Sequence, residues 1–240
     1  MKSVVASVLA RLRNNSKSSG APFQQVLQQY AIERFLYRIS KSKHVHSVIL
    51  KGALLLKTIG IPSARPTMDI DMLRKGKADQ ASLVALVKDC ATLEVEADGL
   101  SFLADSVVAE EITKDSEYKG MRILMDARMD NVRLKIQIDF GVGDVMVPGP
   151  RMIEYPAFLD SDTIHLLAYP VESAIAEEAP GNGCTRQRQQ PDEGLLRRVD
   201  LLESSRLQHG HPSRGHRRYI QKSENTLASR RIRSPHDRLR

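Results

Sequence analysis

The sequence predicts an α+β domain in which helices flank a mixed sheet, and three observations support this. Residues 22–40 carry apolar side chains at helical spacing. Residues 121–129 and 132–139 alternate as paired strands do, around Asp130-Asn131. A short apolar run at 48–50 leads into Gly52, a small residue suited to a turn before a helix. A chain of 240 residues is long enough to bury a sizeable core in one or two domains.

The N-terminal part, residues 1–45, is predicted to be helical. Residues 3–13 are predicted to form a short amphipathic helix, in which Arg11 and Arg13 follow the apolar Val4-Val5-Ala6. Residues 22–40 form a longer helix that is expected to bury one apolar face. The side chains on that face are Phe23, Val26, Leu27, Tyr30, Phe35 and Ile39.

From residue 46 to 177 the pattern alternates between strands and helices. A strand at 48–50 precedes a helix from Gly52 to about Lys57, which Gly60 and Pro62 would end. Further predictions, in order, are a helix at 78–91, strands at 93–98 and 106–113, the hairpin of 121–129 with 132–139, and a helix at 171–177.

The composition changes near residue 178. Residues 178–240 hold 14 of the 36 basic residues and 7 of the 29 acidic residues, so they carry the whole net charge of +7. Of those basic residues, all but Lys222 are arginine, and the stretch lacks an apolar period. It is predicted to be a poorly ordered Arg-rich tail, which leaves the body electrically neutral.

Other features limit the cellular setting. The sequence contains no run of 18 or more apolar residues, so no membrane span is predicted. The two cysteines, Cys90 and Cys184, do not make a disulfide framework, and residues 1–13 do not resemble a secretory signal. A cytoplasmic protein without a membrane partner is the expectation.

Asp69 and Asp71 are the most informative pair in the chain. Carboxylates at positions i and i+2 of a strand point to the same face, while Ile70 between them would point inward. Asp139, at the end of the apolar run 132–139, is a candidate third carboxylate. Three carboxylates around one point form a hard oxygen site for a divalent cation. With the turn at Gly52, this arrangement resembles the layout of a nucleotidyltransferase palm.

The body resembles the AbiEii/AbiGii family of nucleotidyltransferase toxins, abortive-infection proteins with a DNA polymerase β-like palm. The resemblance covers about residues 4–177. It is carried by five segments: Tyr30-Ala-Ile-Glu-Arg-Phe-Leu-Tyr-Arg-Ile-Ser, Leu50-Lys-Gly-Ala, Arg65-Pro-Thr-Met-Asp-Ile-Asp, Gln137-Ile-Asp-Phe-Gly-Val-Gly-Asp and Tyr169-Pro-Val-Glu-Ser-Ala-Ile-Ala-Glu.

The resemblance implies transfer of a nucleoside monophosphate from an NTP to an acceptor such as RNA, for example a tRNA end. It implies that Asp69, Asp71 and Asp139 bind Mg²⁺ or Mn²⁺. Lys51, Gly52 and Ala53 would lie against the triphosphate, although Ala53 lacks the hydroxyl that the family often has there. Met68 also stands where the family often has arginine. A toxin of this kind would have a cognate antitoxin and a role in phage defence.

Two motifs expected after residue 177 are missing. The family continues with Glu-Lys-Leu and then Arg-Met-Lys-Asp, whose Lys and Asp complete its active site. Here the chain reads Glu177-Glu178-Ala179-Pro180. Codons consistent with the sequence from Glu178 onward, shifted by one base, restore Lys-Leu-Gln-Ala-Met-Val and later Ser-Arg-Met-Lys-Asp-Tyr-Phe-Asp. We therefore interpret residues 178–240 as an out-of-frame tail, and we expect impaired activity.

Two interpretations compete with the enzyme. One is a non-catalytic nucleic-acid-binding protein that uses the basic tail, whose binding would weaken steeply as salt rises. The other is an inert remnant whose palm retains nucleotide or antitoxin binding. Within the enzyme hypothesis, a small-molecule acceptor stays open as an alternative to RNA.

Overall fold

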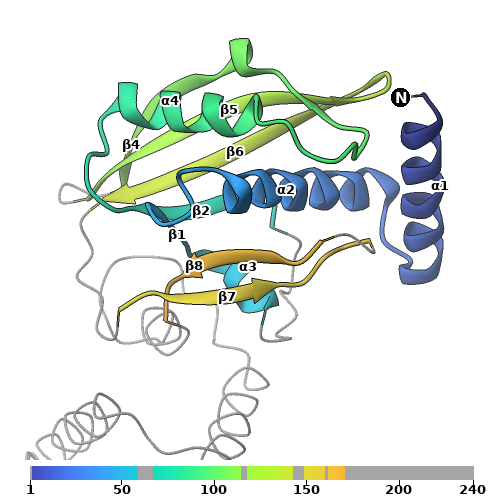
Figure 1. Cartoon of the computed structure of the whole chain (residues 1–240), viewed down its shortest axis with the longest axis horizontal. Coiled ribbons are helices and arrows are strands. Elements are labelled where there is room, and N and C mark those ends of the chain that lie inside the picture. The colour runs from blue at the N-terminus through green and yellow to red at the C-terminus, as the bar shows by residue number, and fades with distance from the viewer. Residues whose placement is uncertain (1, 59–66, 115–117, 143–148, 160–161, 171–240) are drawn as a thin grey trace, which may run out of the picture. The chain divides into compact units, whose positions relative to one another are not determined.

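A computed structural model describes residues 2–58, 67–114, 118–142, 149–159 and 162–170 (Figure 1). They belong to one compact unit, Met1–Glu178, and the second unit, Ala179–Arg240, lies outside the described residues. The predicted helix at 171–177, the helix-ending Gly60 and Pro62, and the predicted tail also lie outside them.

The helices are α1 (Lys2–Ser19), α2 (Phe23–Lys41), α3 (Gly52–Lys57), α4 (Gln80–Ala91) and the short 3-10 helix η1 (Ala104–Ser106). The strands are β1 (Val48–Leu50), β2 (Asp69–Arg74), β3 (Ser101–Phe102), β4 (Val108–Lys114), β5 (Tyr118–Met129), β6 (Val132–Val142), β7 (Arg151–Tyr155) and β8 (Ile164–Ala168). The predicted α+β class with a mixed sheet is confirmed.

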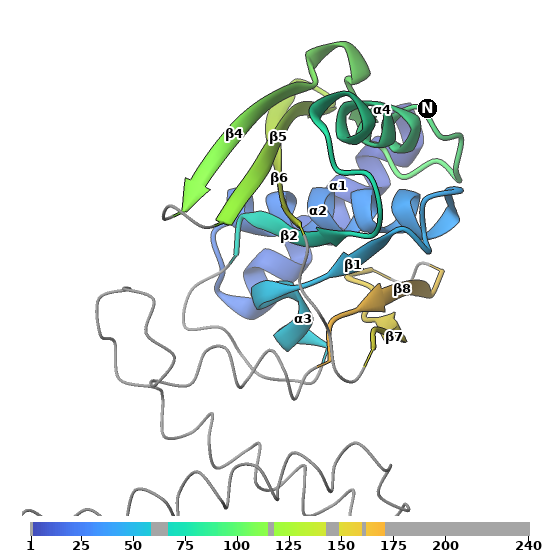
Figure 2. The same ribbon diagram turned by 90° about the vertical axis from the view of Figure 1, so that its left-hand side faces the viewer.

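The sheet has the order β3-β5-β6-β2-β1-β8-β7, and β4 pairs with β5. Two of its contacts are parallel, β2 with β6 and β1 with β8, while the others are antiparallel. The sheet is strongly curled, and α2 and α4 lie within the curl (Figure 2). Strands β8 and β6 both pack against the buried helix α2.

Helix α2 is the centre of the core, and more than the one predicted apolar face is buried. Side chains are buried all round the helix between Val26 and Ile39, those of Glu33, Arg34 and Arg38 included. Leu27, Phe35 and Ile39 are fully buried, and Phe35 packs against Phe102 with ring centroids 5.4 Å apart. Burying side chains of this size is worth about 1.5–3 kcal/mol each. Helix α1 extends to Ser19, six residues beyond the predicted end at residue 13.

The predicted hairpin is confirmed. Strands β5 and β6 pair in antiparallel register from Met129 opposite Val132 to Met121 opposite Phe140. The two-residue connection places Asp130 at φ 52°, a left-handed conformation that Asp tolerates better than most residues. Because β6 continues to Val142, Asp139 lies inside the strand and not at its end.

The predicted strand at 93–98 is wrong. Those residues form a loop, and the strand that follows, β3, starts only at Ser101. The cause is Asp98, whose carboxylate turns inward to Arg34 and Arg38 of α2. Gly99 then adopts φ 77°, which interrupts an extended backbone. Apolar periodicity could not show this tertiary contact.

Candidate functional site

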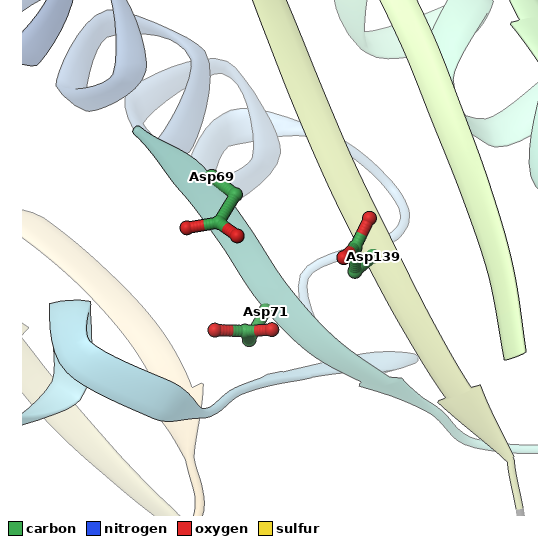
Figure 3. A group of neighbouring side chains, drawn as sticks. All are labelled: Asp69, Asp71 and Asp139. Atoms are coloured by element: carbon green, nitrogen blue, oxygen red, sulfur yellow. The ribbon is translucent and has the colours of Figure 1, made fainter. Parts of the chain in front are cut away.

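The three predicted carboxylates meet on neighbouring strands. Asp69 and Asp71 lie on β2, and Asp139 lies on β6 directly beside Asp71 in the parallel register. One carboxylate oxygen from each lies within 4.8 Å of the others (Figure 3). Asp69 and Asp71 are half-buried, whereas Asp139 is only 7% exposed. Ile70, between the two β2 aspartates, is fully buried, as predicted.

Gly52 lies against this carboxylate cluster. The Lys51 backbone N–H donates to the Asp71 carbonyl at 2.8 Å, and the Tyr169 N–H donates to the Leu50 carbonyl at 2.9 Å. These bonds fix the start of α3 beside β2. Gly52 has φ 66°, and a Cβ atom built there would lie 2.9 Å from Asp71 Cγ. The backbone conformation therefore favours glycine, and a side chain at this position would force the Asp71 carboxylate to move.

The predicted phosphate-binding residues lie beside this carboxylate cluster, at the start of α3. Lys51 is half-buried, and its ammonium lies 4.5 Å from the centroid of the Tyr169 ring. A cation over an aromatic face at this distance is electrostatically favourable. Ala53 is half-buried on the first turn of α3. Met68, just before the first aspartate, is 49% exposed.

Thr67 and Arg122 make short hydrogen bonds to the cluster, and Gln137 makes longer ones to Asp139 at 3.4 and 3.5 Å. None of the three was predicted as a site residue from the sequence. The Thr67 hydroxyl donates to Asp69 Oδ1 at 2.9 Å. Arg122 on β5 forms two parallel hydrogen bonds to Asp139, from Nε to Oδ1 and from Nη2 to Oδ2, each 2.8 Å long. The hairpin register offered a signal for Arg122. Counting back from Met129 opposite Val132 places Arg122 directly opposite Asp139.

The neighbouring carboxylates shift the pKa of the Arg122 guanidinium. Its hydrogen bonds to Asp139 raise the pKa of the guanidinium, and the charges of Asp139, Asp69 and Glu110 raise it further against the opposing effect of burial. Arg122 therefore stays positively charged beside the carboxylates at any physiological pH.

The donor set suits a divalent cation. Carboxylate oxygens are the ligands that Mg²⁺ and Mn²⁺ prefer, and three converge here from two rigid strands. Gly52 leaves the space next to Asp71 free of a side chain. Asp139 is the most enclosed of the three, and it is the one that Arg122 engages.

A family model connects this geometry to known proteins. The model for the nucleotidyl transferase AbiEii toxin of type IV toxin–antitoxin systems matches residues 34–178, more than half of the chain. The chain belongs to this AbiEii family. The matched segment contains all three aspartates and the Gly52 turn, together with part of α2. It ends at the residue where the composition of the sequence changes.

Other comparisons give weaker likenesses. JHP933 from Helicobacter pylori is 13% identical with a TM-score of 0.45, over 69% of this chain and 61% of that one. An H. pylori protein inferred to be a nucleotidyltransferase is 15% identical with a TM-score of 0.44, over 69% and 63%. The AbiEii-family chain thus spans less than two-thirds of either structure's length. None of the curated proteins matches.

Within the described part of the chain, none of the helices combines the length and apolar character needed to cross a bilayer.

Proposed function

We propose that this chain carries the metal-dependent nucleotidyltransferase site of an AbiEii-type toxin, which transfers NMP from an NTP to an acceptor. The observation that supports the proposal most strongly is the convergence of Asp69, Asp71 and Asp139 beside Gly52, within the segment that matches the family. Exposed acidic clusters are common, but a glycine at positive φ whose added Cβ would displace one of the carboxylates is a more specific feature.

In this proposal each residue has a distinct task. Asp69, Asp71 and Asp139 hold Mg²⁺ or Mn²⁺, and Lys51, Gly52 and Ala53 line the approach of the triphosphate. A bound divalent cation supplies charge neutralisation of the phosphates and orientation for in-line attack. The strands supply positioning, because β2 and β6 hold the three carboxylates without large rearrangement.

The acceptor and the partners are finer proposals that come from the family. We propose an RNA acceptor such as a tRNA end, a cognate antitoxin, and phage defence in the cytoplasm. The body of the chain is electrically neutral, so RNA recognition would depend on local groups near the site. The buried free Cys90 is compatible with a reducing compartment.

We also propose that the 240-residue chain is impaired. The family match ends at residue 178, where the Lys-Leu and Arg-Met-Lys-Asp motifs fail to appear in the sequence. Loss of charge-stabilising groups of this type commonly costs about 10²–10³ in rate. Resequencing the DNA across codons 174–200 tests the cause. One surplus base would establish the frame shift, and an unchanged sequence would refute it.

Activity is tested with labelled NTPs, Mg²⁺ and total tRNA. We expect a frame-restored chain to transfer label, the 240-residue chain to be at least about 100-fold slower, and Asp69→Asn or Asp71→Asn in the restored chain to lose transfer by a similar factor. Asp105→Asn, at an exposed position of η1, is the matched control. Full transfer by the Asp69→Asn and Asp71→Asn variants would refute the proposed site.

A further inference from the structure

We infer that Arg122 is a positioning residue of this site, an internal counter-ion that holds Asp139 in the absence of a cation and competes with the cation for it. The inference rests on the proposed function, since it concerns the same carboxylates. Arg122 is not assigned a contact with substrate. Its proposed effect on cation binding arises because it holds the carboxylate of Asp139.

The contact between the two side chains is specific. Arg122 and Asp139 are directly paired across β5 and β6, and both carboxylate oxygens of Asp139 accept from the guanidinium at 2.8 Å. A bidentate pair fixes the plane of the carboxylate as well as its position. The Asp139 side chain is 8% exposed while that of Arg122 is 32% exposed, so the arginine retains access to solvent on one side.

The structure also offers Arg122 a second acceptor. Gln137 lies on β6 two residues before Asp139, on the same face of the strand. With the Gln137 amide turned so that its oxygen faces the guanidinium, that oxygen accepts from Arg122 Nε and Nη2, both at 3.1 Å. In the opposite orientation the amide instead donates to the two Asp139 oxygens at 3.4 and 3.5 Å, so the turned amide exchanges two long hydrogen bonds for two shorter ones from Arg122. Arg122 can therefore loosen its hold on Asp139 without losing every acceptor.

Charge makes the relation to a cation competitive. Asp139 attracts both Arg122 and a divalent cation, and the two positive groups repel each other across one carboxylate. Removing the guanidinium charge should therefore make the cluster a tighter cation site. A purely structural Arg122 predicts the opposite, because a buried Asp139 without its arginine would be poorly oriented and would bind a cation less well.

Mn²⁺ titration of the full 240-residue chain, followed by electron paramagnetic resonance, separates the two models. We expect Arg122→Gln to lower the Mn²⁺ dissociation constant by about tenfold, and Mn²⁺ to raise the melting temperature more in this variant than in the wild type. Arg128→Gln is the matched control. It removes one charge from an exposed arginine on the same strand and should leave Mn²⁺ affinity unchanged.

Arg122→Lys keeps the charge but loses the bidentate geometry, so we expect a smaller gain in affinity in the same direction. This variant decides the matter if Arg122→Gln does not fold. If the Arg122 variants bind Mn²⁺ more weakly than the wild type, or equally tightly, this inference is wrong while the proposed function stands. If neither the wild type nor any variant binds Mn²⁺, both the inference and the proposed cation site are wrong.

Discussion

Within the described part of the chain, Asp98 and Asp139 each accept hydrogen bonds from arginine, but the two clusters combine aspartate and arginine in opposite proportions. Asp98 accepts from Arg34 Nε at 2.9 Å and from Arg38 Nη1 at 2.6 Å, so two arginines share one carboxylate. At the β2–β6 corner the proportion is reversed, since Arg122 stands beside three carboxylates and its hydrogen bonds engage the one on Asp139. The first arrangement is buried and both Asp98 oxygens accept hydrogen bonds, although the buried Arg38 Nε makes none within the described residues. The second is acidic and partly open.

The two clusters differ in how their charges are balanced, and this difference indicates that the Asp98 cluster has a structural role. Burial alone would raise the pKa of Asp98, but hydrogen bonds and charge from Arg38 and Arg34, with the Leu100 N–H, outweigh it and hold that pKa below its ordinary value. This cluster already supplies its own cations. The β2–β6 cluster has three carboxylates and only one hydrogen-bonded arginine among the described residues, so its negative charge exceeds its positive charge. An excess of carboxylate oxygens of this kind favours binding of an external cation.

Asp98→Asn should have the largest effect. It leaves the buried guanidinium groups of Arg34 and Arg38 without their carboxylate, and breaking a buried pair in this way costs about 3–5 kcal/mol. Urea denaturation measures the loss. Asp105→Asn, at an exposed aspartate, is the control and should change stability by less than about 0.5 kcal/mol. A similarly small change for Asp98→Asn would show that the network does not support the fold.

Glu33 is a buried carboxylate that, unlike Asp98, has no hydrogen-bonded arginine among the described residues. It is 1% exposed, and neither oxygen makes a hydrogen bond of ordinary geometry within that part of the chain. Burial raises its pKa from 4.5 to about 7, against smaller opposing effects of the Phe158 backbone, Lys57 and Arg34.

The folded protein therefore retains a proton on Glu33 that the unfolded chain releases. The resulting loss of stability develops as pH rises from about 4.5 to 7 and is complete above that range. Glu33→Gln should remove this dependence and stabilise the protein at pH 8 by up to about 3 kcal/mol, with little effect at pH 4.5. Urea denaturation at both pH values measures it. A variant whose stability relative to wild type is the same at both would contradict the buried-charge explanation.

Gly52→Ala should cost less overall but should act at the acidic corner. The positive φ costs about 1–2 kcal/mol for a non-glycine residue, and the new Cβ would also displace the Asp71 carboxylate. Gly76→Ala is the matched control, since Gly76 has φ 82° but no atom within 4 Å of an added Cβ. We expect both variants to lose stability and only Gly52→Ala to lose Mn²⁺ affinity. Equal Mn²⁺ binding by the two would argue against the role of Gly52.

Asp69→Asn should have the smallest effect on stability, with a sign opposite to that of Asp98→Asn. It removes one of three neighbouring charges while keeping an acceptor for the Thr67 hydroxyl. In metal-free buffer we expect a gain of up to about 1 kcal/mol, measured by urea denaturation against the Asp105→Asn control. A loss of several kcal/mol would mean that this corner is a structural network like that of Asp98.

Local features of the fold could be predicted well from the sequence. The period of α2, the hairpin around Asp130 and the Asp69–Asp71 strand depend on neighbours a few residues apart. Strands β7 and β8 were not predicted. They are five residues each and form part of the sheet through pairing with each other and with β1. A short strand has too few alternations to be distinguished from a loop.

Long-range contacts explain the remaining errors and omissions. Asp98 lies 64 residues from Arg34, and this contact converts a predicted strand into a loop. Arg122 lies 17 residues from Asp139, close enough for the hairpin register to predict their pairing once the turn is fixed. The convergence of the two β2 aspartates with Asp139 depended on a parallel pairing that local patterns do not specify.

We propose that the cluster of Asp69, Asp71 and Asp139, and not the cluster around Asp98, binds the catalytic cation. Mn²⁺ binding by the full chain, followed by electron paramagnetic resonance, tests this most directly when wild type is compared with Asp71→Asn and Asp105→Asn. We predict saturable binding by wild type and Asp105→Asn that weakens at least about tenfold in Asp71→Asn. Equal binding by all three would show that Asp71 is not a cation ligand and would contradict the claim.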